Sequence, residues 1–300
     1  MNSGYDAVVG LVENRFDMVV DRGSITALQR PYDHHLLTLK FSTATHETYF
    51  LKESHHHSPE HLQVVFSALE TIRNHPPQLS FPLCTNDGAY HFSDSNERHF
   101  QLLTFLDLAP FDPTTVSLER LFGQLAGLHL NLSRCQVPSN RYSDLPAYVV
   151  LGLRRIQKRY GADLPFLPRL ESFINRLPLG SLRQGGRHGD IQETNVCLQG
   201  ADIVFVDADN VHLGYPLMDT IQGAVIYLDQ AELCGSANQA VVEQVWQQVK
   251  GEAEAITRRD VRYLLARVML GPIQGGELQP SKAALNRFLL DLECFCEDGE

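Results

Sequence analysis

The pattern of apolar and polar residues changes about a third of the way along this 300-residue chain. In the first third, short runs rich in β-branched and aromatic residues predict strands at 36–41, 48–51 and 100–105. A helix is predicted to begin at Ser58-Pro59-Glu60, which supplies a capping serine, a proline at the first helical position and an acid in the first turn. This part of the chain therefore predicts a small sheet with a helix.

From residue 117 onward the apolar residues recur at helical spacing. The leucines at 118, 121, 125, 128 and 132 form one stripe, and further helices are predicted over 145–159, 167–176, 220–231, 238–257, 261–270 and 281–294. The intervening segment 108–115 contains two prolines. We therefore predict a domain of residues 1–106 and a second, mainly helical domain of residues 107–300.

Two short apolar runs, 196–198 and 203–206, flank a four-residue connection that contains Gly200, and this pattern predicts a β-hairpin. The residue entering the first strand of a hairpin faces the residue leaving the second, so Asn195 and Asp207 are expected about 5 Å apart. Asp190 lies five residues before Asn195, on the loop that leads into the hairpin. Two carboxylates and an amide are thus expected at one site, and such oxygen ligands suit Mg²⁺.

Composition and charge exclude several classes of protein. A net charge of −11 disfavours a general nucleic-acid binder, which needs a basic surface to neutralise phosphates. No apolar run approaches the roughly 20 residues that span a bilayer, and no basic region followed by an apolar run marks a signal peptide. The cysteines are scattered without a Cys-x-x-Cys pair. We expect a cytoplasmic protein that binds neither nucleic acid nor membrane.

The spacing His188-x-Asp190-x-x-x-x-Asn195, followed by Asp207 and Asp219, matches the order of residues in phosphoryl-transferring enzymes. This set resembles the aminoglycoside phosphotransferase/choline kinase-like family, bacterial relatives of protein kinases. The resemblance implies a two-lobed, protein-kinase-like α+β fold with a small antiparallel-sheet N-terminal lobe and a mainly helical C-terminal lobe. It also implies ATP and Mg²⁺ as cofactors and a hydroxyl group as phosphoryl acceptor.

In the roles that the resemblance implies, Asp190 is the catalytic residue that orients the acceptor hydroxyl and takes its proton. Asn195 and Asp207 bind the metal. His188 and Asp219 support the catalytic loop, Asp219 through hydrogen bonds to the backbone.

The nucleotide-binding residues are implied in the same way. Lys52 closes a predicted strand and resembles the kinase lysine that contacts the α- and β-phosphates. Glu60 is the preferred helix partner of this lysine, and Glu70 is the second choice. The backbone between Thr104 and Leu106 resembles the segment that meets the adenine edge.

The phosphate-binding loop departs from the pattern of many family members, because only Gly23 lies near the expected place. The loop at 27–35 resembles that of the stress-response kinase A and spore-coat kinase branches, and Tyr32 falls where their loop has its tyrosine. The acceptor therefore stays open between a small molecule, such as a metabolite or antibiotic, and a protein Ser or Thr. A nucleotide-binding pseudokinase that acts as an interaction module is the remaining alternative.

Overall fold

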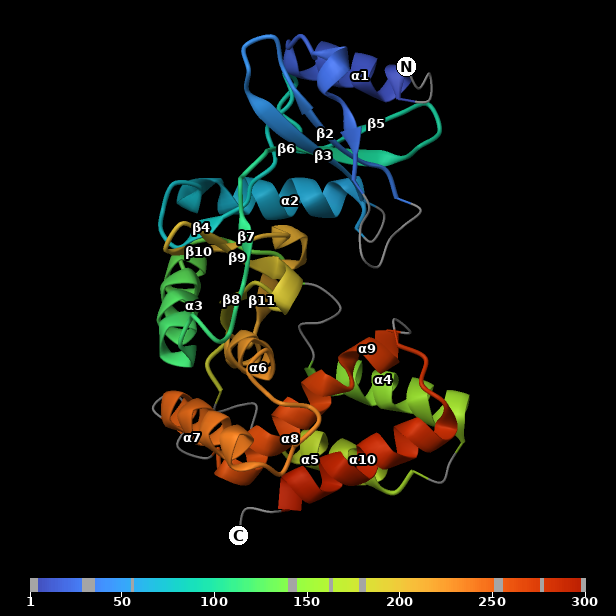
Figure 1. Cartoon of the computed structure of the whole chain (residues 1–300), viewed down its shortest axis with the longest axis vertical. Coiled ribbons are helices and arrows are strands. Elements are labelled where there is room, and N and C mark those ends of the chain that lie inside the picture. Colours follow the sequence, from blue (N-terminus) through green and yellow to red (C-terminus); the bar gives the residue numbers. More distant parts are fainter. Residues whose placement is uncertain are drawn as a thin grey trace. The chain divides into compact units, whose positions relative to one another are not determined.

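The computed structural model describes residues 5–28, 36–54, 57–139, 145–161, 164–177, 182–250, 256–275 and 278–297. The chain forms two compact units (Figure 1). The first contains Met1–Ala109 and two later segments, Cys135–Val137 and Leu198–Asp209, and the second contains the rest. The first unit is built around an antiparallel sheet and the second is mostly helical, which confirms the predicted α+β class.

The first unit contains a five-stranded antiparallel sheet in the order β1-β2-β3-β6-β5. Strand β3 lies at its centre, and its Lys52 is paired with Thr38 on one side and Gln101 on the other. The elements described for this part of the chain are α1 (Asp6–Phe16), η1 (Arg22–Ser24), β1 (Thr26–Ala27), β2 (Thr38–Ser42), β3 (Thr48–Ser54), α2 (Pro59–Leu69), η2 (Glu70–Ile72), β4 (Gln78–Leu79), β5 (Phe92–Ser93) and β6 (His99–Thr104).

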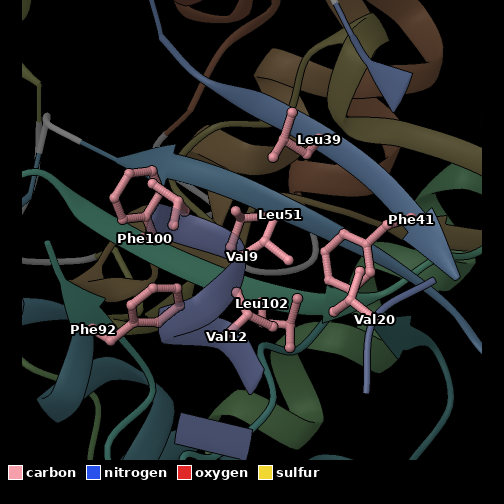
Figure 2. Close-up of a cluster of buried hydrophobic side chains, with 10 residues drawn as sticks. Val9, Val12, Val20, Leu39, Phe41, Leu51, Phe92, Phe100 and Leu102 are labelled. Atoms are coloured by element: carbon pink, nitrogen blue, oxygen red, sulfur yellow. The ribbon is translucent and has the colours of Figure 1, made fainter. Parts of the chain in front are cut away.

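The core of the first unit lies between α1 and this sheet (Figure 2). Burying one such apolar side chain completely stabilises the fold by about 1.5–3 kcal/mol. Neighbouring residues of a strand point to opposite faces, so Leu51 enters the core while Lys52 points to the other face. The core residues are Val8, Val9, Val12, Val20, Leu39, Phe41, Leu51, Phe92, Phe100 and Leu102.

A second sheet explains why the first unit extends beyond the predicted range of residues 1–106. Its order is β4-β10-β9-β7, where β7 is Ala109–Pro110, β9 is Val196–Gln199 and β10 is Asp202–Phe205. Strand β10 pairs in parallel with β4, with Val204 opposite Gln78. The neighbouring strands β9 and β10 confirm the predicted hairpin. The parallel pair was not predicted, because its strands are far apart in the sequence.

The second unit consists mainly of helices and also contains the short antiparallel strand pair β8 and β11. Among the helices in the described ranges, none is long and apolar enough to cross a membrane. The elements are α3 (Leu118–Leu132), α4 (Leu145–Tyr160), α5 (Phe166–Arg176), β8 (Gly185–Arg187), η4 (Glu193–Asn195), β11 (His212–Gly214), α6 (Leu217–Val225), α7 (Ser236–Lys250), α8 (Arg258–Met269), α9 (Gly271–Gly275) and α10 (Lys282–Glu297), and η5 (Ala208–Asn210) links β10 to β11.

The carboxylate of Asp219, in the first turn of α6, is fully buried and joins three parts of the second unit. Its oxygens accept hydrogen bonds from Nε of Arg187 (3.0 Å), the last residue of β8, and from the backbone N–H groups of His188 (2.6 Å) and Gly189 (3.0 Å) in the turn that follows. His129 Nε2 of α3 lies 3.0 Å away. Burial alone would raise the pKa of Asp219, but the Arg187 guanidinium and the hydrogen-bonded imidazole of His129 hold it well below its usual range. The carboxylate is therefore ionised and fully engaged.

Replacing this carboxylate tests its contribution to stability. Asp219→Asn leaves the Arg187 guanidinium buried without its counter-charge, which typically costs about 3–5 kcal/mol. Urea unfolding should show a loss of this order. The control is Glu243→Gln, which removes a solvent-exposed ion pair with Arg258 and should leave the unfolding midpoint nearly unchanged. Equal midpoints for Asp219→Asn and the parent would contradict this account.

The same comparison has a defined pH dependence. The pKa of Asp219 is lower in the folded state than its usual value of about 3.9, so its contribution is present above that value and is lost as the pH falls. The stability difference between parent and Asp219→Asn should therefore shrink below about pH 4. A difference that stays constant down to acid unfolding would show that ionisation of this group is not the cause.

Candidate active site

The turn that follows β8 presents Asp190, and its shape requires a glycine. Gly189 has φ +86°, a left-handed conformation that glycine adopts at no steric cost. A Cβ at this position would lie 2.6 Å from the carbonyl oxygen of Asn210 and within 2.8 Å of the His212 ring. The buried carboxylate of Asp219 holds this turn through two backbone N–H groups. The backbone before Asp190 is therefore fixed on both sides.

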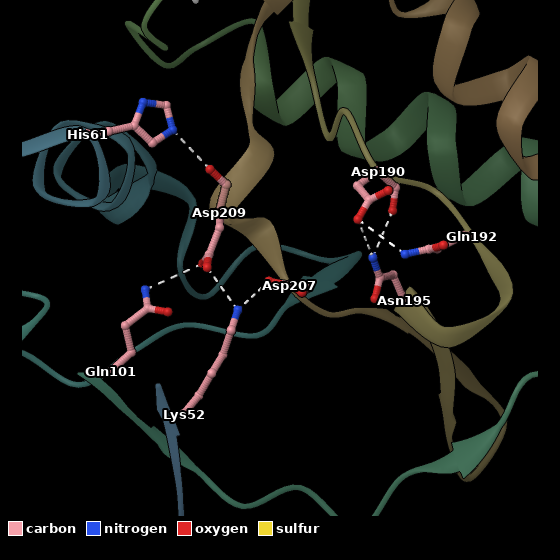
Figure 3. Close-up of polar contacts among 8 residues, drawn as sticks. All are labelled: Lys52, His61, Gln101, Asp190, Gln192, Asn195, Asp207 and Asp209. Carbon is pink, nitrogen blue, oxygen red and sulfur yellow. Dashed lines mark hydrogen bonds and ion pairs between the residues drawn. The ribbon is translucent and has the colours of Figure 1, made fainter. Parts of the chain in front are cut away.

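The Asp190 carboxylate is half-buried and is held by two amides (Figure 3). Asn195 Nδ2 donates to Asp190 Oδ2 at 2.8 Å and to the Asp190 carbonyl oxygen at 3.1 Å. Gln192 Nε2 donates to the same carboxylate oxygen at 3.3 Å. Because the amide nitrogen of Asn195 faces Asp190, its amide oxygen points away from it.

A second polar group lies within the first unit, on the face of the sheet opposite the core. The register of β3 and β6 places Lys52 beside Gln101, so both side chains leave the same face. Lys52 Nζ donates to Asp207 Oδ1 and, at 2.8 Å, to Asp209 Oδ2 (Figure 3). Gln101 Nε2 donates to Asp209 Oδ1 at 3.3 Å. One ammonium group thus meets two carboxylates.

Electrostatics keep Lys52 charged in this position. Burial disfavours the ammonium ion, but the two carboxylates together outweigh burial and raise the pKa of Lys52 above its usual value. The aspartates differ in exposure, since the side chain of Asp207 is 38% exposed and that of Asp209 only 7%. Asp207 also has φ +62°, a backbone conformation that costs a non-glycine residue energy and is often found at functional sites.

The expected ion pair between Lys52 and Glu60 is not formed in this structure. Within the described part of the chain, the ammonium group of Lys52 contacts Asp207 and Asp209 instead. Glu60 is exposed in the first turn of α2, where hydrogen bonds to its own backbone N–H and to Ser58 lower its pKa. An acid in this position stabilises its own helix.

The structure also places the other residues that were predicted to bind the nucleotide or to pair with Lys52. Glu70, the second choice as lysine partner, accepts a hydrogen bond from the Tyr90 hydroxyl at 2.7 Å. Thr104 is the exposed last residue of β6, and Leu106 follows it half-buried. Their contact with an adenine stays a prediction. Tyr32 lies outside the described residues.

Three residues around Lys52 were not predicted from the sequence. Asp209 follows Asp207 by two positions, Gln101 interrupts an apolar strand, and His61 Nε2 lies 3.0 Å from the Asp209 carbonyl oxygen. A single polar residue within an apolar strand was the available signal, because a buried amide needs a partner. The identity of that partner depends on strand register, which the local pattern does not reveal.

The oxygen donors fit the divalent cation that the resemblance implies. Within the first unit Asp207 offers an accessible carboxylate, and within the second unit Asn195 offers an amide oxygen. Each is a donor of the hard type that Mg²⁺ prefers. The residues that the structure describes contain no group of three or more His, Cys, Asp or Glu side chains arranged to hold a metal. Protein sites for Mg²⁺ commonly supply only one or two carboxylates, and waters and substrate phosphates complete the shell.

Comparisons with known proteins agree with this chemistry. The model of the phosphotransferase enzyme family (APH) matches residues 32–251. No curated protein sequence gives a significant match.

Several solved structures share the fold. Amicoumacin kinase in complex with AMP-PNP, Ca²⁺ and Ami is 14% identical, with a TM-score of 0.66 over 95% of this chain and 92% of that chain. A microcompartment-associated aminopropanol kinase is 15% identical, with a TM-score of 0.60 over 97% and 95% of the two chains. A choline kinase from Streptococcus pneumoniae is 10% identical, with a TM-score of 0.60 over 96% and 97%.

These likenesses confirm the kinase-like α+β fold. The family model covers most of the sequence, including the Asp190, Asn195 and Asp207 positions. The chain therefore belongs to the phosphotransferase enzyme family.

Proposed function

We propose that this phosphotransferase moves the γ-phosphate of ATP to a hydroxyl group of a small molecule in a Mg²⁺-dependent reaction. The observation that carries the proposal is the Asp190 carboxylate, held by the amides of Asn195 and Gln192 on a turn anchored by Asp219. The structural relatives support a small acceptor, since their names specify amicoumacin, aminopropanol and choline.

Asp190 orients the acceptor hydroxyl and takes its proton. As the hydroxyl oxygen bonds to the γ-phosphorus, the bond to the β–γ bridging oxygen breaks and ADP leaves. The proton passes to the Asp190 carboxylate, which must be ionised beforehand. The two amide donors fix the orientation of the carboxylate. Positioning supplies a large share of the acceleration in such reactions.

The remaining residues hold the nucleotide. Lys52 stays protonated despite its burial, which suits a contact to the α- and β-phosphates. Asn195 and Asp207 supply oxygen ligands for Mg²⁺. When bound, the cation neutralises the charge that develops on the transferred phosphoryl group.

A screen with γ-labelled ATP tests the function. The purified parent should transfer label to a hydroxyl-bearing small molecule, such as an amino alcohol or an aminoglycoside. Asp190→Asn should lose about 10²–10⁴ in rate, because it removes the positioned base while preserving side-chain shape. Affinity for Mg-ATP should change far less. Label on a protein Ser or Thr would instead indicate a protein kinase, and Mg-ATP binding without transfer to any acceptor would indicate a pseudokinase.

Calorimetry with ATP tests the metal assignment. Mg²⁺ should strengthen ATP binding by the parent. In Asp207→Asn the increase in ATP affinity caused by Mg²⁺ should be about 10–100-fold smaller, because one charged ligand is removed. Asparagine tolerates the left-handed backbone of Asp207, so the loop should keep its conformation.

The matched control is Asp202→Asn, an exposed aspartate at the start of β10. It should behave like the parent at every Mg²⁺ concentration. An Asp207→Asn protein with the full Mg²⁺ effect would remove Asp207 from the metal site.

A further inference from the structure

We infer that Asp209 positions Lys52 for nucleotide binding, the task that a helix glutamate performs in protein kinases. The inference rests on the proposed function, because it assigns Lys52 to the phosphates of ATP. It goes further by naming the residue that holds the lysine in place. Asp209 acts through Lys52 and is therefore a positioning residue.

The contacts of Asp209 come from three elements of the first unit. Its Oδ2 accepts from Lys52 of β3 at 2.8 Å, and its Oδ1 accepts from Gln101 of β6 at 3.3 Å. Its carbonyl oxygen lies 3.0 Å from His61 Nε2 of α2. Each carboxylate oxygen thus has a protein donor, and the backbone is also held. A carboxylate bound in this way provides a fixed point for the ammonium group.

The two aspartates that meet Lys52 are suited to different tasks. Asp207 is accessible and lies on a strained backbone, as expected of a residue that binds a ligand. Asp209 is buried, and both of its side-chain oxygens are already engaged within the protein. When Asp207 binds a cation, Asp209 is the carboxylate that remains with Lys52.

The position of α2 also favours Asp209 over the helix acid. Glu60 lies in the exposed first turn of α2 and interacts with its own helix end. The next residue, His61, is the one that reaches the loop, through the Asp209 carbonyl group. The helix therefore contributes to the lysine site indirectly, by holding the backbone of Asp209.

A double-mutant cycle on Mg-ATP affinity, measured by calorimetry, tests the inference. Asp209→Asn and Lys52→Ala should each weaken binding about tenfold, because a charge-assisted contact is lost or misplaced. The double variant should bind no more weakly than the worse single variant, since the two residues act as a unit. Glu60→Gln should bind like the parent.

A Mg²⁺ titration separates positioning from metal binding. Asp209→Asn should need the same half-saturating Mg²⁺ concentration as the parent, whereas Asp207→Asn should need more. A raised requirement in Asp209→Asn would make it a metal ligand and overturn the inference. The inference would also be overturned if the losses of Mg-ATP affinity in Asp209→Asn and Lys52→Ala were additive, or if Glu60→Gln were the only variant that lost affinity.

The proposed function can fail separately. A parent that does not bind Mg-ATP would overturn it, whereas a parent that binds but is indifferent to Asp209→Asn would overturn only the inference. If Asp209→Asn does not fold, Gln101→Leu removes one of the groups that fix Asp209 while preserving volume. It should weaken Mg-ATP binding in the same direction, and unchanged binding would count against the inference.

A separate observation concerns two cysteines in the second unit. Cys234 lies in the connection between α6 and α7, Cys294 lies on α10, and their Sγ atoms are 2.8 Å apart. Both are exposed, whereas neighbouring Cys296 is buried and burial raises the pKa of its thiol. We infer that Cys234 and Cys294 form a reversible disulfide when peroxide is present.

The reaction consumes one equivalent of hydrogen peroxide, which is reduced to water as the two thiols are oxidised. One thiol ionises, and its sulfur attacks a peroxide oxygen. The O–O bond breaks to give a sulfenic acid and hydroxide, and the hydroxide takes up the proton of that thiol to become water. The second sulfur then attacks the sulfenic sulfur, and a disulfide and a second water are formed. The sulfur atoms, 2.8 Å apart, need to approach by less than about 1 Å to reach the approximately 2.05 Å of a disulfide, so little movement is needed. The bond would close a long loop and so restrict the unfolded chain.

Peptide mass mapping after peroxide treatment tests this inference. The parent should yield one crosslinked peptide that joins Cys234 to Cys294 and disappears with dithiothreitol. Its urea midpoint should rise on oxidation, and Cys234→Ser should show neither effect. Cys84→Ser, which removes another exposed thiol, should behave like the parent. Sulfinic acid at either position without the crosslink, or a crosslink between two chains, would overturn the inference.

Discussion

The structure depends on carboxylates that are buried together with their hydrogen-bond donors. An ionised acid without partners inside a protein costs several kcal/mol, so every element that supplies a donor to Asp219 must stay in place. Helix α3, the turn after β8 and helix α6 all meet at this group. The same turn presents Asp190, so the contacts that stabilise the fold also fix the backbone of the residue that we propose as catalytic.

Much of the loop that carries Asp190 in the second unit follows from local sequence. The residues from His188 to Asn195 are close in the chain, and their spacing alone indicates which side chains belong together. The capping signal at Ser58 located the start of α2, and the leucine spacing located α3. In both helices the structure shows a serine side chain that accepts a hydrogen bond from the first turn. Such features depend on neighbours within a few residues, which the sequence displays directly.

The surroundings of Lys52 could not be predicted in this way. Gln101 and Asp209 are brought to the lysine by strand register and by a loop far along the chain. The helix acid Glu60 was the plausible partner by resemblance, but an acid in a first turn already has favourable interactions with its own helix. The predicted range of the first domain did not include the later segments of the first unit for the same reason. Strands β4 and β10 are far apart in the sequence and come together only by pairing in the folded chain.

The parallel pairing of β4 with β10 has a consequence for synthesis on the ribosome. The first unit cannot be completed when its own N-terminal stretch has emerged, because a strand from much later in the chain must still be added. Until then the nascent chain carries an unpaired strand edge, which is prone to association with other chains. Slow closure of such long-range contacts would make chaperone protection most valuable while residues between the two strands are being translated.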